Sequence, residues 1–168
     1  DVPGAAKNLE RLQAAFSDYL IVGTSAESEV ALREAAKTGL VDYTPGDATF
    51  SIAGELSDKQ RAALDFITAN VLEPFGSTGI QTILDAAVFD FLKYVAVFPG
   101  GSRLEDKDGN TLPDCFLMPP GSTALDFAYR LHTDFGKNFI KAVDVRKKLP
   151  VGKDHVLAHR DIIEIMAK

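Results

Sequence analysis

The sequence contains a single cysteine, Cys115, so the chain cannot form an internal disulfide framework, which fits a reducing cytoplasm. No apolar run is long enough to span a bilayer, and no charged and then apolar segment opens the chain as a signal peptide would. We therefore expect a cytoplasmic protein without a membrane partner. We expect Cys115 to be a buried strand residue, because free cysteines are commonly buried.

A phosphate-binding loop is also missing. The best candidate is Gly121-Ser122-Thr123, where a glycine and two hydroxyls precede a helical pattern, but no lysine follows to reach a phosphate. The alternative is an ordinary helix start, in which Thr123 caps the helix and Asp126 reaches back to it. The second interpretation fits better, although helix N-termini attract anions in general.

Metal ligands at recognisable spacing are absent as well. The stretch from Asp106 to Asn110 resembles a calcium loop, but the Gly and Glu that an EF-hand requires further along are missing, so we expect a turn. The three histidines have no partner at ligand spacing. We expect His132 to cap a helix end, His155 and His159 to be solvated loop residues, and no metal site.

Charge is distributed unevenly along the 168 residues, whose net charge is -6. Residues 1–96 carry seven Lys and Arg against 14 Asp and Glu, whereas residues 97–168 carry 11 against 10. This asymmetry indicates two units with different neighbours, and neither is basic enough to indicate nucleic-acid binding by charge alone. The chain begins with Asp1 rather than Met, and we expect it to be a piece of a longer protein or a processed product.

Helical and strand patterns alternate in the first half. Apolar spacing predicts a helix near 9–16, a buried strand at 19–22, and a second helix over 27–37, which is the rhythm of a parallel α/β sheet. A loop is predicted for 41–54. A capping box at Ser57 begins a helix that we expect to run to about Leu72 and to break at Pro74 and Gly76.

The helix predicted for 78–94 carries a broad apolar stripe that must pack on something large. Strand patterns then follow at 94–98, 115–118, 139–145 and 162–165, with a short strand within 151–157, and one helix begins at Thr123. One helix across a small mixed sheet is an α+β plan.

The segment from Leu117 to Ile165 resembles a TGS domain, the module named for threonyl-tRNA synthetases, GTPases and the SpoT family. The matching pieces are the Pro-Gly-Ser-Thr-Ala turn, the Ala-Tyr-x-Leu-His-Thr-Asp helix end and the final Arg-Asp-Ile-Ile-Glu-Ile strand. The resemblance implies a β-grasp, or ubiquitin-like, fold. Ala158-His159-Arg160 departs from relatives that carry an acidic residue and Gly there.

The segment from Asp1 to Tyr94 resembles the C-terminal part of the G domain in archaeal Obg-like proteins related to YchF. The stretches DVPGA, TSAE, LREAAKTGLVDYTPGD and GSTGIQ carry this resemblance. Thr24-Ser25-Ala26 is similar to the Ser-Ala loop that contacts guanine in translation-factor-class GTPases. Asp1 lies one helix and one strand earlier, where the Asp of the Asn-Lys-x-Asp motif would fall.

These resemblances imply a guanine site made by four residues. A carboxylate at Asp1 would accept hydrogen bonds from the N1 and N2 donors of guanine, which adenine does not offer. The Ala26 N–H would donate to guanine O6, while Thr24 and Ser25 shape the loop. Two simpler interpretations stay open: Asp1 as a frayed terminus, and Ser25 as a helix N-cap. An Asp favours GTP, whereas YchF itself carries Glu and prefers ATP.

We therefore predict part of an α/β P-loop GTPase domain over 1–94 and a β-grasp TGS domain over 95–168. The parent protein would use GTP and Mg²⁺. Phosphoryl transfer needs a phosphate cradle, Mg²⁺ ligands and a positioned water, so we expect this chain alone to hold neither cofactor tightly and to be inactive. The alternatives are a stand-alone β-grasp interaction module and the TGS region of a synthetase or SpoT-type protein.

The TGS resemblance also implies a ribosome, RNA or protein partner, and no DNA. Exposed cations on a small domain are commonly only solvated, and the salt dependence of binding would decide between the two interpretations. The candidate contacts are Arg130, Lys137, Lys141, Arg146, Lys147, Lys148 and Lys153, with Phe139 or Tyr129 nearby.

Overall fold

The computed structural model describes residues 2–101, 104–105, 108–111 and 114–168. The chain divides into two compact units, residues 1–86 and residues 87–168, which are described separately. The predicted boundary between residues 94 and 95 stays a prediction.

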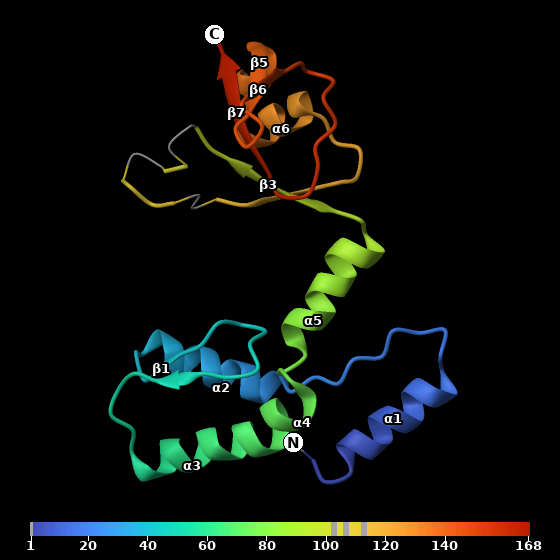
Figure 1. Cartoon of the computed structure of the whole chain (residues 1–168), viewed down its shortest axis with the longest axis vertical. Coiled ribbons are helices and arrows are strands. Elements are labelled where there is room, and N and C mark those ends of the chain that lie inside the picture. Colours follow the sequence, from blue (N-terminus) through green and yellow to red (C-terminus); the bar gives the residue numbers. More distant parts are fainter. Residues whose placement is uncertain (1, 102–103, 106–107, 112–113) are drawn as a thin grey trace. The chain divides into compact units, whose positions relative to one another are not determined.

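The first unit is mainly helical (Figure 1). Its helices are α1 (Ala5–Ala15), α2 (Ala26–Lys37), α3 (Asp58–Ile67), the π-helical η1 (Thr68–Leu72), α4 (Glu73–Phe75) and α5 (Ile80–Asp85), and α5 continues into η2 (Ala86–Phe91) across the boundary between the units. The predicted helices near 9–16, over 27–37 and from Ser57 are thus confirmed, with small shifts of their ends.

The helix that begins after Ser57 has the predicted capping box. The Ser57 N–H donates to Gln60 Oε1 at 2.9 Å, and the Ser57 hydroxyl accepts from the Gln60 N–H at 3.4 Å. The predicted break at Pro74 and Gly76 is confirmed at Gly76, where the helix ends and whose φ of 74° suits glycine. Pro74 does not itself break the helix, because it lies in the first turn of α4, where its missing N–H costs little.

Residues 19–22 do not form the predicted strand. A strand needs a hydrogen-bonded neighbour, and no described residue pairs with this segment. The two-stranded sheet of the first unit is the antiparallel pair β1 (Val41–Asp42) and β2 (Ser51–Ile52), within the region predicted as loop. The described residues of this unit therefore contain no parallel sheet.

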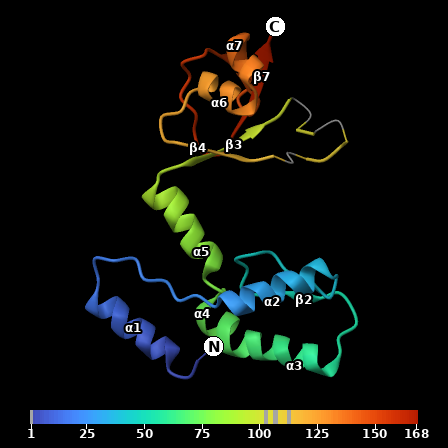
Figure 2. The same ribbon diagram turned by 180° about the vertical axis from the view of Figure 1, so that it is seen from behind.

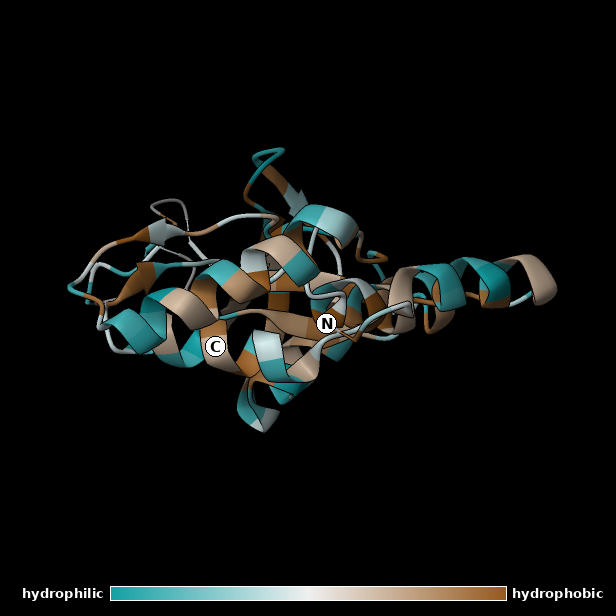
Figure 3. Ribbon diagram, turned by 90° about the horizontal axis from the view of Figure 1, so that it is seen from below, coloured by the Kyte–Doolittle hydropathy of each residue, from teal (hydrophilic) through white to brown (hydrophobic). Residues whose placement is uncertain are grey.

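The core of the first unit is formed by α2, β1, α3 and η1. Its buried members are Leu32, Val41, Leu64, Ile67, Val71 and Leu72. Helix α1 buries none of its residues, and hydrophobic positions lie beside hydrophilic ones along the helical ribbons (Figure 3).

Much of the apolar stripe of α5 and η2 is exposed, although Ile80 and Val88 are half-buried. Ile83 is 38% exposed, Leu84 49% and Phe91 84%. Neither helix contains a buried residue. The prediction that this stripe packs on something large is therefore wrong for the described residues.

The second unit contains a five-stranded sheet of order β4-β3-β7-β5-β6. The central pair β3–β7 is parallel, and the other neighbours are antiparallel. The strands are β3 (Val95–Pro99), β4 (Phe116–Met118), β5 (Phe139–Asp144), β6 (Leu149–Val151) and β7 (Asp161–Ala167). The predicted α+β plan is confirmed in these elements, although the short strand expected within 151–157 comes earlier.

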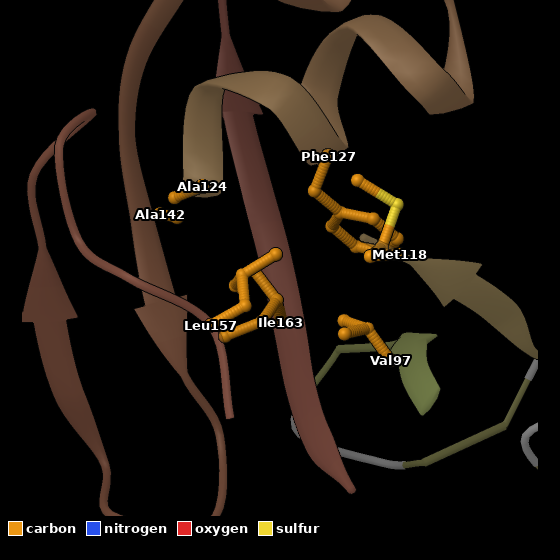
Figure 4. Close-up of a cluster of buried hydrophobic side chains, with 7 residues drawn as sticks. All are labelled: Val97, Met118, Ala124, Phe127, Ala142, Leu157 and Ile163. Carbon is orange, nitrogen blue, oxygen red and sulfur yellow. The ribbon is translucent and has the colours of Figure 1, made fainter. Parts of the chain in front are cut away.

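Helix α6 (Ala124–Leu131) packs on one face of this sheet, and the short α7 (Thr133–Lys137), which the sequence patterns missed, follows it beside β7 (Figure 2). Figure 4 shows Phe127 of α6 directed toward the buried side chains of the strands. The whole cluster is Val97, Met118, Ala124, Phe127, Ala142, Leu157 and Ile163. Cys115 precedes β4 and is exposed, so its predicted burial is wrong.

The capping-box prediction at Thr123 is confirmed. The Thr123 N–H donates to Asp126 Oδ2 at 2.8 Å, and the Asp126 N–H donates to Thr123 Oγ1 at 3.3 Å. Gly121 precedes this start with a φ of 80°, which glycine adopts without strain. Within the described ranges, no helix is long and apolar enough to cross a membrane.

Candidate functional site

The loop Gly23–Ser25 leads into the N-terminus of α2. Ser25 is the N-cap residue of α2, as one interpretation predicts, but its hydroxyl donates to Ser28 Oγ at 2.8 Å rather than capping a backbone N–H. Ala26 is the first residue of the helix, where backbone N–H groups have no intrahelical acceptor. Thr24 and Ala26 are exposed and Ser25 is half-buried.

A second segment, Ser77–Gly79, contacts the backbone of this loop. The Ser25 N–H donates to the Thr78 carbonyl at 2.9 Å. Gly79 has a φ of 77°, and a Cβ at this position would collide with the Gly23 carbonyl oxygen. Only glycine allows this close approach of two backbones. The loop geometry thus depends on residues more than 50 positions further along the chain.

A buried carboxylate, Glu29, connects α2 to the same segment. Glu29 is 4% exposed, and its Oε2 accepts hydrogen bonds from Thr78 Oγ1 at 2.6 Å and from the Tyr43 hydroxyl at 2.8 Å. Its Oε1 forms an ion pair with Arg33 Nε at 2.6 Å. Burial by itself would raise the pKa of Glu29, but the hydrogen bonds from Thr78, Arg33 and Tyr43 outweigh it and lower the pKa. Glu29 therefore stays ionised and holds three segments together.

A cavity of about 250 Å³ lies against the loop. Its wall includes Val2 at the beginning of the described chain, Leu9 of α1, Thr24 and Ser25 of the loop, and Thr78. This volume is below the roughly 300–1,000 Å³ of pockets for drug-sized ligands, so it suits a ring system better than a whole nucleotide. The predicted contact Asp1 lies outside the described residues.

The predicted contacts of the second unit are distributed over several surfaces. All six of Arg130, Lys137, Lys141, Arg146, Lys147 and Lys148 are exposed. The Arg130 guanidinium lies 5.9 Å from the centroid of the Phe116 ring, and Lys147 Nζ forms an ion pair with Asp144 Oδ2 at 2.6 Å. Arg146 and Lys148 line one cavity, to which Lys137 and Lys141 do not contribute.

The histidines differ in their surroundings. His132 caps α7 by accepting the Asp134 N–H at 3.2 Å, which confirms its predicted role. His159 is exposed, but its Nδ1 accepts the Ala96 N–H at 3.2 Å. His155 is not solvated as predicted, because its Nε2 is buried and has no hydrogen-bond partner among the described residues.

His155 also lies near two buried carboxylates, Asp144 and Asp161, with one ligand atom from each residue within 4.8 Å of the others. No sequence pattern predicts this cluster, because its members come from β5, a loop and β7. Asp144 is already paired with Lys147, and Asp161 Oδ2 accepts the Ala158 N–H at 2.8 Å. We therefore interpret the two carboxylates as turn-stabilising groups.

Comparisons with known proteins agree with both resemblances. Residues 1–101 match the family model described as Obg-like GTPase YGR210-like, G4 motif-containing domain, and residues 94–167 match the TGS domain model. The chain is 42% identical over 169 residues to the GTP-binding protein MJ1332 of Methanocaldococcus jannaschii, covering 99% of this chain and 43% of that protein. It is 30% identical over 135 residues to the GTP-binding protein C428.15 of Schizosaccharomyces pombe, covering 74% and 33%.

A crystal structure of a GTP-binding protein from Pyrococcus horikoshii OT3 is also similar, with a TM-score of 0.68 and 38% identity over 96% of this chain and 42% of that one. The chain thus spans less than half the length of these relatives. It belongs to the Obg-like GTPase family, in its YGR210-like branch, as a G4 motif-containing segment followed by a TGS domain.

Proposed function

We propose that residues 1–86 supply the base-recognising side of a guanine-nucleotide site. The observation that carries this proposal is the shared cavity: Val2, the neighbour of Asp1, and the loop residues Thr24 and Ser25 line the same 250 Å³ space. A carboxylate beside that space would accept from guanine N1 and N2, and the Ala26 N–H at the start of α2 would donate to O6.

The phosphates of GTP and the Mg²⁺ that accompanies them would be held by parts of a GTPase outside residues 1–168. Residues 1–168 contain no phosphate-binding loop lysine, so we propose base selection for this chain and no turnover. A phosphate-release assay on the chain should give no GTP hydrolysis above the buffer rate, and robust turnover would contradict this part.

An NMR titration tests the base site. In the ¹⁵N-labelled chain, millimolar guanosine nucleotide should shift the amide resonances of Thr24, Ser25 and Ala26, whereas the adenosine nucleotide should not. Asp1→Asn should remove the preference, because an amide cannot accept both guanine donors, and Asp18→Asn is the matched control. Equal shifts with both nucleotides, or shifts elsewhere, would refute the proposal.

We further propose that the second unit is a β-grasp that binds RNA. The strand order β4-β3-β7-β5-β6, with a parallel central pair and α6 across one face, supports the β-grasp assignment. Support for RNA comes from cations that line one cavity of this unit without an ion pair among the described residues, namely Arg146 and Lys148. RNA affinity that falls steeply with salt would support this role, and the ribosome is one source of such RNA.

A further inference from the structure

The sheet of the second unit has a face opposite to the one that α6 covers. Side chains alternate between the two faces of a strand, and Val97 and Ile163 belong to the α6 side. Phe98 and Ile162 therefore lie on the opposite face, where they are paired in register between β3 and β7. The Val145 N–H donates to the Ile162 carbonyl at 2.9 Å, which places the end of β5 beside them.

A cavity of about 510 Å³ lies over this face, and we call it the sheet cavity. Its apolar part is supplied by Phe98, Leu104, Val145 and Ile162. Phe98 is half-buried and lines this cavity. An accessible aromatic ring on a sheet surface is a common platform for stacking an unpaired base.

Three cations, Arg146, Lys148 and Arg160, line the same cavity. All three are exposed, and none has a carboxylate partner in the described part of the chain. Arg146 Nη1 donates to the Arg160 carbonyl at 3.2 Å, which brings the two residues together. Lys147, which lies between Arg146 and Lys148 in the sequence, forms an ion pair with Asp144 instead. In a chain of net charge -6, this is a local concentration of unneutralised positive charge.

The backbone around the sheet cavity is unusual. Four described residues other than glycine have a positive φ, and three of them line this cavity: Leu104 at 58°, Lys148 at 56° and Arg160 at 67°. A left-handed backbone is unfavourable for residues that carry a Cβ. Residues of this kind persist where the surrounding structure holds them, and they cluster at ligand sites.

We propose that the sheet cavity binds single-stranded RNA, with one base against Phe98 and the adjoining phosphates against Arg146, Lys148 and Arg160. Guanidinium groups match phosphate oxygens in a bidentate way, and the apolar floor matches a base. An acidic peptide would use the cations but leave the ring without a partner. The proposal rests on the RNA-binding role proposed for this unit, and it assigns that role to one face.

One acidic group limits the path of the strand. Glu164 follows Ile162 by two residues on β7, so it lies on the same face, and it is half-buried. Its charge repels phosphate, so the RNA backbone passes on the side of Arg160. Glu164→Gln should therefore strengthen binding by about twofold to fivefold, since removing a nearby like charge favours an anion.

Fluorescence anisotropy with a labelled ten-nucleotide single-stranded RNA tests the site on the whole chain. Arg146→Gln, Lys148→Gln and Arg160→Gln should each weaken binding about threefold to tenfold and lower the salt slope by about 1. Phe98→Leu keeps an apolar side chain but removes the ring, and it should weaken binding at least about fivefold with an unchanged salt slope. Lys168→Gln, at an exposed cation outside the cavity, is the matched control without effect.

The competing outcomes are distinguishable. RNA binding that depends on Lys137 and Lys141 but not on the cavity residues would overturn the assignment of the binding site to the sheet cavity. It would leave the RNA-binding role of the second unit intact. Competition by an acidic peptide at the concentration at which unlabelled RNA competes would assign the face to a protein partner and overturn the proposal. Absence of RNA binding at low salt would overturn both, whereas the guanine titration would be unaffected.

Discussion

The two units of the chain use their apolar residues differently. In the second unit, α6 and the sheet enclose one cluster around Phe127, which is fully buried. In the first unit, α1 buries no residue, and Phe16, Tyr19 and Leu20 are more than half exposed. The same apolar periodicity thus yields a closed core in one unit and an open surface in the other. Periodicity predicts which face of a helix is apolar, but a partner element must be present to bury it.

The most severe way to disrupt the closed core is Phe127→Ala. It should lower the free energy of unfolding of the second unit by about 3–5 kcal/mol, because it removes a buried ring and leaves a cavity. Hydrogen exchange resolved by segment should show faster exchange in β3, β5 and β7 and no change around Leu32. Leu149→Ala, at an exposed position, is the control, and slower or unchanged exchange in the Phe127 variant would contradict a single shared core.

The first unit depends more on a polar connection, so Glu29→Gln should lower its stability by about 1–3 kcal/mol. An amide NH₂ would face donors that now meet a carboxylate, and a buried unmatched donor is costly. Hydrogen exchange of the Gly23–Ala26 amides should accelerate, because the Ser25 N–H of this loop is hydrogen-bonded to the Thr78 carbonyl. Glu34→Gln, at a largely exposed carboxylate, should change neither quantity. Unchanged loop exchange in the Glu29 variant would separate the loop from this connection.

Acid should weaken both units in different pH ranges. The pKa of Glu29 is lowered from 4.5 and that of Asp144 from 3.8, in each case because hydrogen bonds outweigh burial. A carboxylate with a lowered pKa contributes stability above its unfolded-state pKa and loses it as the pH falls through the folded-state value. We expect the first unit to lose stability below about pH 4.5 and the second unit below about pH 3.8. Segment-resolved exchange from pH 6 downward, with Glu29→Gln as reference, would show a reversed order if this assignment is wrong.

The smallest expected difference lies between the two helix caps. Thr123→Ala and Ser57→Ala should each cost about 1 kcal/mol, because both remove one side of a capping box. The two units should respond alike here, since capping is local and independent of how each core closes. Thermal unfolding monitored for each unit measures this, and a much larger loss for either variant would indicate a tertiary role for that hydroxyl.

Local signals were therefore sufficient for local features. The capping boxes at Ser57 and Thr123, the cap made by His132 and the strand patterns around Phe98 and Ile162 depend on residues a few positions apart. The order of the TGS motifs was likewise readable without coordinates. The strand expected at 19–22 failed because pairing is not a property of one segment.

The sequence by itself determined the family, the α+β plan of the second unit and the start of α6, because each depends on residues that are close together in the chain. Only the tertiary structure decided that Glu29 joins Thr78 and Tyr43, that Gly79 lies against Gly23, and that Phe98 shares a cavity with Arg146 and Arg160. These contacts join residues that are far apart in the chain, and their side chains meet because the packing of helices and strands fixes which surfaces face each other.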